Sequence, residues 1–144
     1  MAVDRSTPPD VSRWDVPALI SGGAVALALG LAATGIAQFL DTDSPVRSLL
    51  VAVAIGGFVL GAALASWAQR KQLPLSHGIV TAVVTYVLTD AVFVIIKLAR
   101  GKSVNWLGLI LKLTLVAGAG LFGGGLGALL RRRGFVPSTE RSAR

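Results

Sequence analysis

Two ionisable residues of this 144-residue chain lie inside long apolar segments, where their types and positions could support chemistry. Asp90 interrupts the apolar segment 77–98, and Lys112 interrupts the apolar segment 104–130. Asp90 lies eight residues before the end of its segment, and Lys112 lies eight residues after the start of its own. Antiparallel helices would therefore place both side chains about 12 Å from the same end of the helix pair. An ionisable group inside an apolar helix that crosses a bilayer costs about 2.5–3.5 kcal/mol, so it normally faces a partner or water. We therefore predict an intramembrane polar pair between Asp90 and Lys112.

Further polar side chains recur at helical spacing around Asp90. Because residues three or four apart are neighbours on a helix surface, they predict a polar face that adjoins Asp90. The members of this predicted polar face are Thr81, Thr85, Tyr86, Thr89 and Lys97. Three interpretations remain open for it: an ion pair that only fixes which helices meet, a transport or ion pathway, or an interface with another subunit.

Other chemistries have few residues to support them. The chain holds no cysteine and one histidine, His77, so we expect no metal site. Outside the two tails the acidic residues are Asp41, Asp43 and Asp90, which provide no carboxylate pair and no serine–histidine–aspartate arrangement. We therefore expect no enzymatic activity and no cofactor.

The composition requires long apolar elements to position these residues. Hydrophobic residues make up 53% of the chain and charged residues 15%, against about 25% charged in soluble domains. No charge occurs in the 25 residues between Asp15 and Asp41 or in the 22 between Arg47 and Arg70, and a helix needs about 20 apolar residues to cross a bilayer. The sequence therefore predicts an all-α integral membrane four-helix bundle. Its parts are an N-terminal tail 1–16, a domain 17–130 with spans 17–40, 48–69, 77–98 and 104–130, and a basic tail 131–144.

Local residues suggest where these helices begin. Pro17 suits the first turn of the first helix, where its missing N–H is not needed. Ser76 and Ser103 are candidate N-caps of the third and fourth helices, because a serine oxygen can accept a backbone N–H there.

The net charge of +7 predicts an orientation. Nine of the basic residues fall in the two tails and in the loop after the second span, against four on the other side. Since cytoplasmic flanks carry an excess of Lys and Arg, we expect both termini in the cytoplasm. The cluster Arg131, Arg132 and Arg133 directly follows a span, and we expect it to contact anionic lipid headgroups rather than nucleic acid.

Small residues form ridges that repeat along the chain. A shift of 63 residues places the ridge Gly57, Gly61 and Ala65 on the ridge Gly120, Gly124 and Ala128. Two explanations remain open: two helix-hairpin repeats related by an axis along the membrane normal, or a likeness of composition. In either case small residues let membrane helices approach closely, within one chain or between two copies.

The chain also resembles a known group of proteins. The resemblance rests on Gly56-Gly57-Phe58-x2-Gly61, on Arg70-Lys71, on Leu73-Pro74-Leu75-Ser76-His77-Gly78 and on the Gly-rich last span. Over about residues 50–130 it is similar to small Gly-rich four-span bacterial membrane proteins of uncharacterised function. This resemblance implies a four-helix fold in a bacterial plasma membrane and supplies no active residues.

Two functional hypotheses follow from these patterns. The first is a structural or accessory membrane protein that packs with itself or with a membrane partner through its Gly/Ala ridges. The alternative is a small oligomeric transporter, channel or holin-like pore that uses the Asp90–Lys112 polar face. The expected partners are a bilayer with anionic headgroups and a second copy or another membrane protein.

Overall fold

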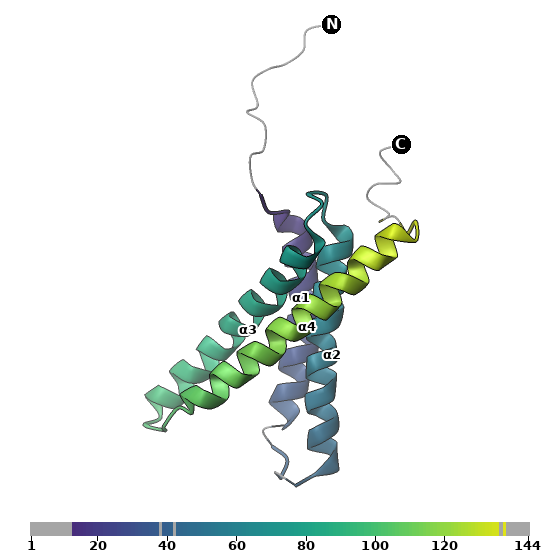
Figure 1. Cartoon of the computed structure of the whole chain (residues 1–144). Coiled ribbons are helices and arrows are strands. Elements are labelled where there is room, and N and C mark those ends of the chain that lie inside the picture. Colours follow the sequence, from purple (N-terminus) through teal and green to yellow (C-terminus); the bar gives the residue numbers. More distant parts are fainter. Residues whose placement is uncertain (1–12, 38, 42, 136, 138–144) are drawn as a thin grey trace, which may run out of the picture.

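The computed structural model describes residues 13–37, 39–41, 43–135 and 137. These residues form four helices and no strand: α1 (Val16–Ala37), α2 (Pro45–Ala68), α3 (Pro74–Ala99) and α4 (Trp106–Arg132) (Figure 1). Each helix is long and apolar enough to cross a membrane. The prediction of an all-α membrane fold with four helices is confirmed, and every helix end lies within three residues of its predicted bound.

Prolines and one asparagine set the helix starts. Pro17 lies in the first turn of α1, as predicted, and Pro74 takes the first position of α3. Ser76 is therefore inside α3, and its prediction as an N-cap is wrong. Ser103 is not the N-cap of α4 either, because that helix begins later, after Asn105. The side chain of Asn105 accepts a hydrogen bond of 2.9 Å from the backbone of the first turn, as N-cap residues do.

The helices form two hairpins, α1–α2 and α3–α4, that meet at one end and diverge at the other (Figure 1). We call the end where they meet the basic end, because its described basic residues are Arg13, Arg70, Lys71, Arg131, Arg132 and Arg133. The opposite end, where the hairpin loops 38–44 and 100–105 lie, is the far end. The buried residues of α3 lie between His77 and Thr85, in the half of that helix nearest the basic end. In the far half of this hairpin, α3 and α4 therefore contact each other and no other described helix.

The ridge Gly57, Gly61 and Ala65 of α2 lies against α1. A methyl group added to Gly61 would lie 2.7 Å from the Cβ of Ala26, and one added to Gly57 would lie 2.7 Å from the Cβ of Leu29. Real side-chain contacts are longer than this, so the two helices approach as closely as they do because glycine lacks a side chain.

The equivalent ridge of α4 lies against α3. A methyl group on Gly120 would lie 2.9 Å from the Cβ of Ala82, and one on Gly124 would lie 3.2 Å from the Cα of Leu75. The third member, Ala128, is half-buried. Glycines that are 63 residues apart thus have the same role: they let the second helix of each hairpin pack closely on the first.

A second stripe of α4 joins the two hairpins. A methyl group on Gly123 would lie 2.8 Å from the Cβ of Ala62, and one on Gly127 would lie 2.7 Å from the Cβ of Ser66. Both Gly-rich faces of α4 are thereby occupied by helices of the same chain, which leaves these stripes no room for a second copy.

Candidate functional site

Asp90 has a partner on its own helix. The hydroxyl of Tyr86 donates to Oδ2 of Asp90 at 2.8 Å, and it lies 3.3 Å from the carbonyl oxygen of Leu109 in α4. The Tyr86 ring also packs edge-on against Phe58 of α2, with ring centroids 6.4 Å apart. Tyr86 therefore touches both hairpins where they begin to diverge and holds the half-buried Asp90 carboxylate beside α4.

Lys112 lies in the far half of α4 and is exposed. No ion pair joins Lys112 to Asp90 or to any other described residue. Lys112 lies four residues before the buried Val116 and eleven before Gly123, so it continues the stripe of α4 that packs on α2 nearer the basic end. The half of α4 nearest the far end, to which Lys112 belongs, diverges from α2 (Figure 1).

The structure thus does not bring the predicted pair of Asp90 and Lys112 together. Counting residues from the helix ends gives each side chain its depth, but not its direction around the helix axis. The carboxylate takes the nearest donor, which is the Tyr86 hydroxyl one turn away.

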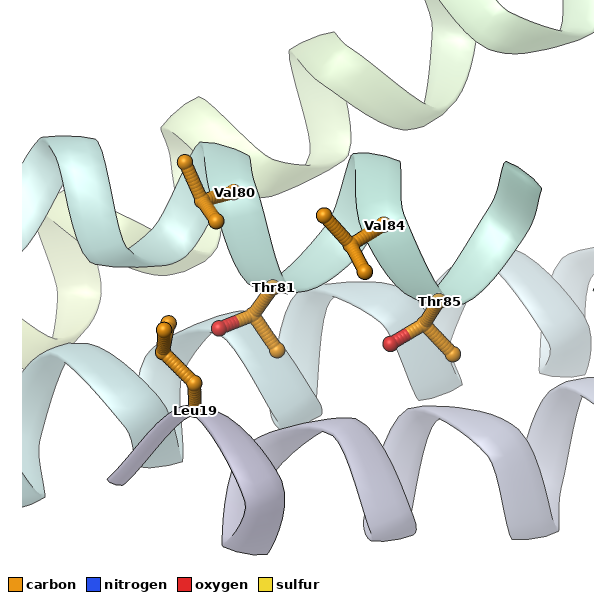
Figure 2. A pocket seen from close by; sticks show the side chains of 5 residues that line it. All are labelled: Leu19, Val80, Thr81, Val84 and Thr85. Carbon is orange, nitrogen blue, oxygen red and sulfur yellow. The ribbon is translucent and has the colours of Figure 1, made fainter. Parts of the chain in front are cut away.

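The predicted polar face divides into separate environments. Thr81 and Thr85 are buried and line a hollow of about 110 Å³ together with Leu19 of α1, Val80 and Val84 (Figure 2). The other three members lie elsewhere, Tyr86 against Asp90 and α4 as described above. The Thr89 hydroxyl donates to the carbonyl oxygen of Thr85 at 2.8 Å, as threonines in helices often do, and Lys97 is exposed in the last turn of α3.

Within the hollow, Oγ1 of Thr81 is buried and has no hydrogen-bond partner among the residues that the structure describes. Figure 2 shows this oxygen directed toward Leu19, across the space between α3 and α1. A hydroxyl that is removed from water without a partner is unfavourable, so this atom requires an explanation.

His77 lies at the basic end, where the third predicted span begins, and it is fully buried, which the sequence did not indicate. Its Nε2 accepts a hydrogen bond of 3.0 Å from the backbone N–H of Asp15, and its Nδ1 lies 2.8 Å from the carbonyl oxygen of Leu73. A backbone N–H only donates and a carbonyl only accepts, so this arrangement requires a neutral ring with the proton on Nδ1. Trp14 packs edge-on against the ring, with centroids 5.3 Å apart. His77 therefore fixes the start of α1 against the start of α3.

Asp15 fixes the same helix start to the loop after α2. Its Oδ1 lies 3.4 Å from the backbone nitrogen of Ala18, in the position of an N-cap, and its Oδ2 accepts a hydrogen bond of 2.9 Å from the backbone of Arg70. One carboxylate thus satisfies donors from two elements.

Three further contacts close the basic end. The hydroxyl of Ser66 donates to the carbonyl oxygen of Pro74 at 2.6 Å, and the guanidinium of Arg131 donates to the carbonyl oxygen of the buried Gln69. The indole of Trp67 donates to the carbonyl oxygen of Phe135 at 2.7 Å. We call Asp15, Ser66, Gln69, His77 and Arg131 the polar junction.

The polar junction was missed from the sequence because its members come from four helix ends that are far apart in the chain. The sequence signal that could have indicated the polar junction was the pair Ser66 and Gln69, two polar residues at the end of an apolar segment. Of the three arginines expected to contact lipid, Arg131 donates to Gln69, whereas Arg132 and Arg133 are exposed.

Comparison with family models, with curated proteins and with solved structures finds no match for this chain. Within the described residues there is no group of three or more His, Cys, Asp or Glu side chains that could hold a metal ion.

Proposed function

We propose that this protein is an accessory membrane protein that assembles with a second copy of itself through the far half of α3–α4. The Gly/Ala ridges, which the sequence suggested as the contact between copies, pack inside one chain. Association between copies would therefore use a surface that the fold leaves uncovered.

The observation that carries the proposal is the exposed position of Lys112. It lies six residues after Trp106, the first residue of α4, so its Cα is about 9 Å from that helix end. A lysine at such depth in a lipid-facing helix is unfavourable unless an acidic group or water reaches it. The exposed leucines and isoleucines around Lys112 do not by themselves indicate a second copy, because lipid chains can cover apolar side chains equally well.

A second copy could supply the acidic group that Lys112 requires, because the hairpin that carries Lys112 also carries Asp90. Asp90 is half-buried and has a single side-chain donor, Tyr86, so its carboxylate retains acceptor capacity. In a dimer or ring, the Lys112 of one copy would reach the Asp90 of the next. A charged pair removed from water also selects one arrangement of helices over others.

The test is the oligomeric state of the full chain in liposomes, measured by energy transfer between donor-labelled and acceptor-labelled copies as lipid is added. We expect Lys112→Met to weaken self-association by about tenfold or more, since loss of one partner of a buried charged pair costs several kcal/mol. Lys97→Met is the matched control, because Lys97 lies in the last turn of α3, where its ammonium can reach the interface. Equal association of the Lys112→Met variant and the natural chain would contradict the proposal.

A charge exchange tests the pairing itself. Chains with Asp90→Lys and chains with Lys112→Asp should each fail to associate alone, because both members of every contact then carry the same sign. Mixed in one bilayer, they should associate with each other. Failure of the mixture, while Lys112→Met still weakens association, would show that Lys112 meets another group.

The alternative of a transporter or channel has less support. A pathway needs its polar side chains on one surface, whereas Thr81 and Thr85 face α1 and Tyr86 faces α4. Lys112 lies on the stripe of α4 that packs on α2 nearer the basic end. We further propose that the protein lies in a bacterial plasma membrane with both termini in the cytoplasm. The excess of basic residues at the basic end supports this orientation.

A further inference from the structure

The packing between the two hairpins ends partway along α2 and α4. On α4, Gly123 lies against α2 and Val116 belongs to the buried core, but Lys112, four residues nearer the far end, is exposed. The facing stripe of α2 changes in the same way, since Ala63 is buried and Ala52, three turns nearer the far end, is exposed. Beyond the core, each hairpin therefore has an uncovered face on the side of the other hairpin.

Asp90 lies on the same side of the α3–α4 hairpin as Lys112. It comes one helical turn after Tyr86, whose hydroxyl it accepts and whose ring packs on Phe58 of α2. Residues four apart share a helix face, so Asp90 is on the side of α3 that faces α2. The two opposite charges thus belong to one uncovered face of the hairpin.

The register of the hairpin also places the two charges at one level. Gly120 of α4 lies against Ala82 of α3, where an added methyl group would be 2.9 Å from the Cβ of that alanine. Because the helices are antiparallel, eight residues further toward the far end they reach Lys112 on α4 and Asp90 on α3.

A two-fold axis along the membrane normal would satisfy both charges at once. It keeps two copies in the same orientation, and where their hairpins meet face to face it sets α4 of each copy opposite α3 of the other. Since the charges share one face and one level, Lys112 of each copy then faces Asp90 of the other. The contact holds two opposite-charge pairs and leaves neither charge to the hydrocarbon.

We infer that the α2-facing side of the far half of α3–α4 binds the same face of a second copy, in a closed two-fold dimer. This inference rests on the self-association proposed above and adds the face, the opposing helix and the number of copies. The second hairpin takes the place beside α4 that α2 leaves where the hairpins diverge (Figure 1). A ring of more copies would need two different contact faces on each hairpin, whereas the charges lie on one.

Cysteine cross-linking tests the face, because the chain holds no cysteine of its own. Phe93 and Leu109 are half-buried, and each lies three residues nearer the far end than Asp90 and Lys112 respectively, so they lie on the side of these charges. Full chains with Phe93→Cys and full chains with Leu109→Cys are mixed in liposomes and oxidised. We expect several-fold more disulfide-linked dimer from the mixture than from either variant alone, because α3 of one copy lies opposite α4 of the other.

The matched control is a mixture of Ile95→Cys and Leu107→Cys chains. Each of these residues is exposed and lies two positions from Phe93 or Leu109, which is about 200° around its helix. We expect this mixture to give no more dimer than its single variants. If it gave as much dimer as the first mixture while Lys112→Met still weakened energy transfer, the inferred face would be overturned and the proposed self-association would stand.

Counting copies tests the closed dimer with the natural chain, so the result holds even where a cysteine variant fails to fold. Chains that carry one fluorophore each are reconstituted at low density, and the bleaching steps of single complexes are counted. We expect two steps. Complexes of three or more copies would overturn the two-fold dimer, and single copies alone would contradict the proposed self-association itself.

Discussion

At the scale of single residues, His77 joins two helix starts from a fully buried position. Its ring is fully buried, and each ring nitrogen meets a backbone group, one from the start of α1 and one from the turn before α3. The carbonyl oxygen of Leu73 also accepts the helical N–H of His77 at 3.1 Å, so it keeps a partner if the ring is lost. The backbone N–H of the half-buried Asp15 has Nε2 as its partner and would lose it.

We therefore expect His77→Ala to lower the free energy of unfolding by about 2–4 kcal/mol, from the lost packing of a buried ring and one unsatisfied donor. Reversible unfolding of the purified chain in mixed micelles measures this quantity. Ser76→Ala is the neighbouring control and should change it by less than about 0.5 kcal/mol. A His77 variant as stable as the control would mean that the start of α1 is held by other contacts, such as those of Asp15.

At the scale of elements, the sequence predicted the helices well and their neighbours poorly. Run length alone indicates helices where a bilayer is the solvent, because every backbone group must be satisfied within its own segment. The Gly57 and Gly120 ridges were visible in the sequence as small residues at helical spacing. The helices that pack on them were not, since small residues fit any close neighbour. Likewise, the depth of Asp90 and Lys112 could be counted along the chain, whereas their directions depend on how α3 and α4 cross.

The likeness between the two hairpins extends to the glycines of their second helices and not to the register of their first helices. Gly61 lies opposite Ala26, ten residues after the start of α1, whereas its equivalent Gly124 lies opposite Leu75, one residue after the start of α3. The α3–α4 hairpin is therefore packed tightly near the basic end, and its far half extends away from α1–α2 (Figure 1).

Two glycines of α4 test whether this packing depends on close approach. Alanine at Gly127 would overlap Ser66, and we expect it to lower the free energy of unfolding by about 1–3 kcal/mol. Alanine at Gly125, where an added Cβ meets nothing within 4 Å, should instead raise it by up to about 1 kcal/mol through helix propensity. Effects of the same sign in the two variants, measured in the same micelles, would contradict the close packing of α2 on α4.

At the scale of the whole molecule, the two ends differ in charge and in construction. The basic end carries six described basic residues against one described acidic residue, Asp15, and the polar junction holds all four helices together there. The far end carries four described basic residues, which are Arg47, Lys97, Arg100 and Lys102, against Asp41 and Asp43. The excess of basic residues supports the proposed orientation, with the basic end at the cytoplasmic surface and Lys112 nearer the outer one.

The difference in basic residues between the ends is modest, so the orientation can be tested by reversing it. We expect a reporter that is active only in the cytoplasm to be active when fused after Arg144, and a reporter that is active only outside to be active in the loop 100–105, because flanks rich in Lys and Arg stay in the cytoplasm. Replacing Arg131, Arg132 and Arg133 by Gln and adding three Lys to the loop 100–105 should shift part of the population to the opposite orientation. Replacing Arg132 and Arg133 alone, without the added Lys, is the control and should leave the orientation unchanged. An outside location of the natural C-terminus would overturn the proposed orientation.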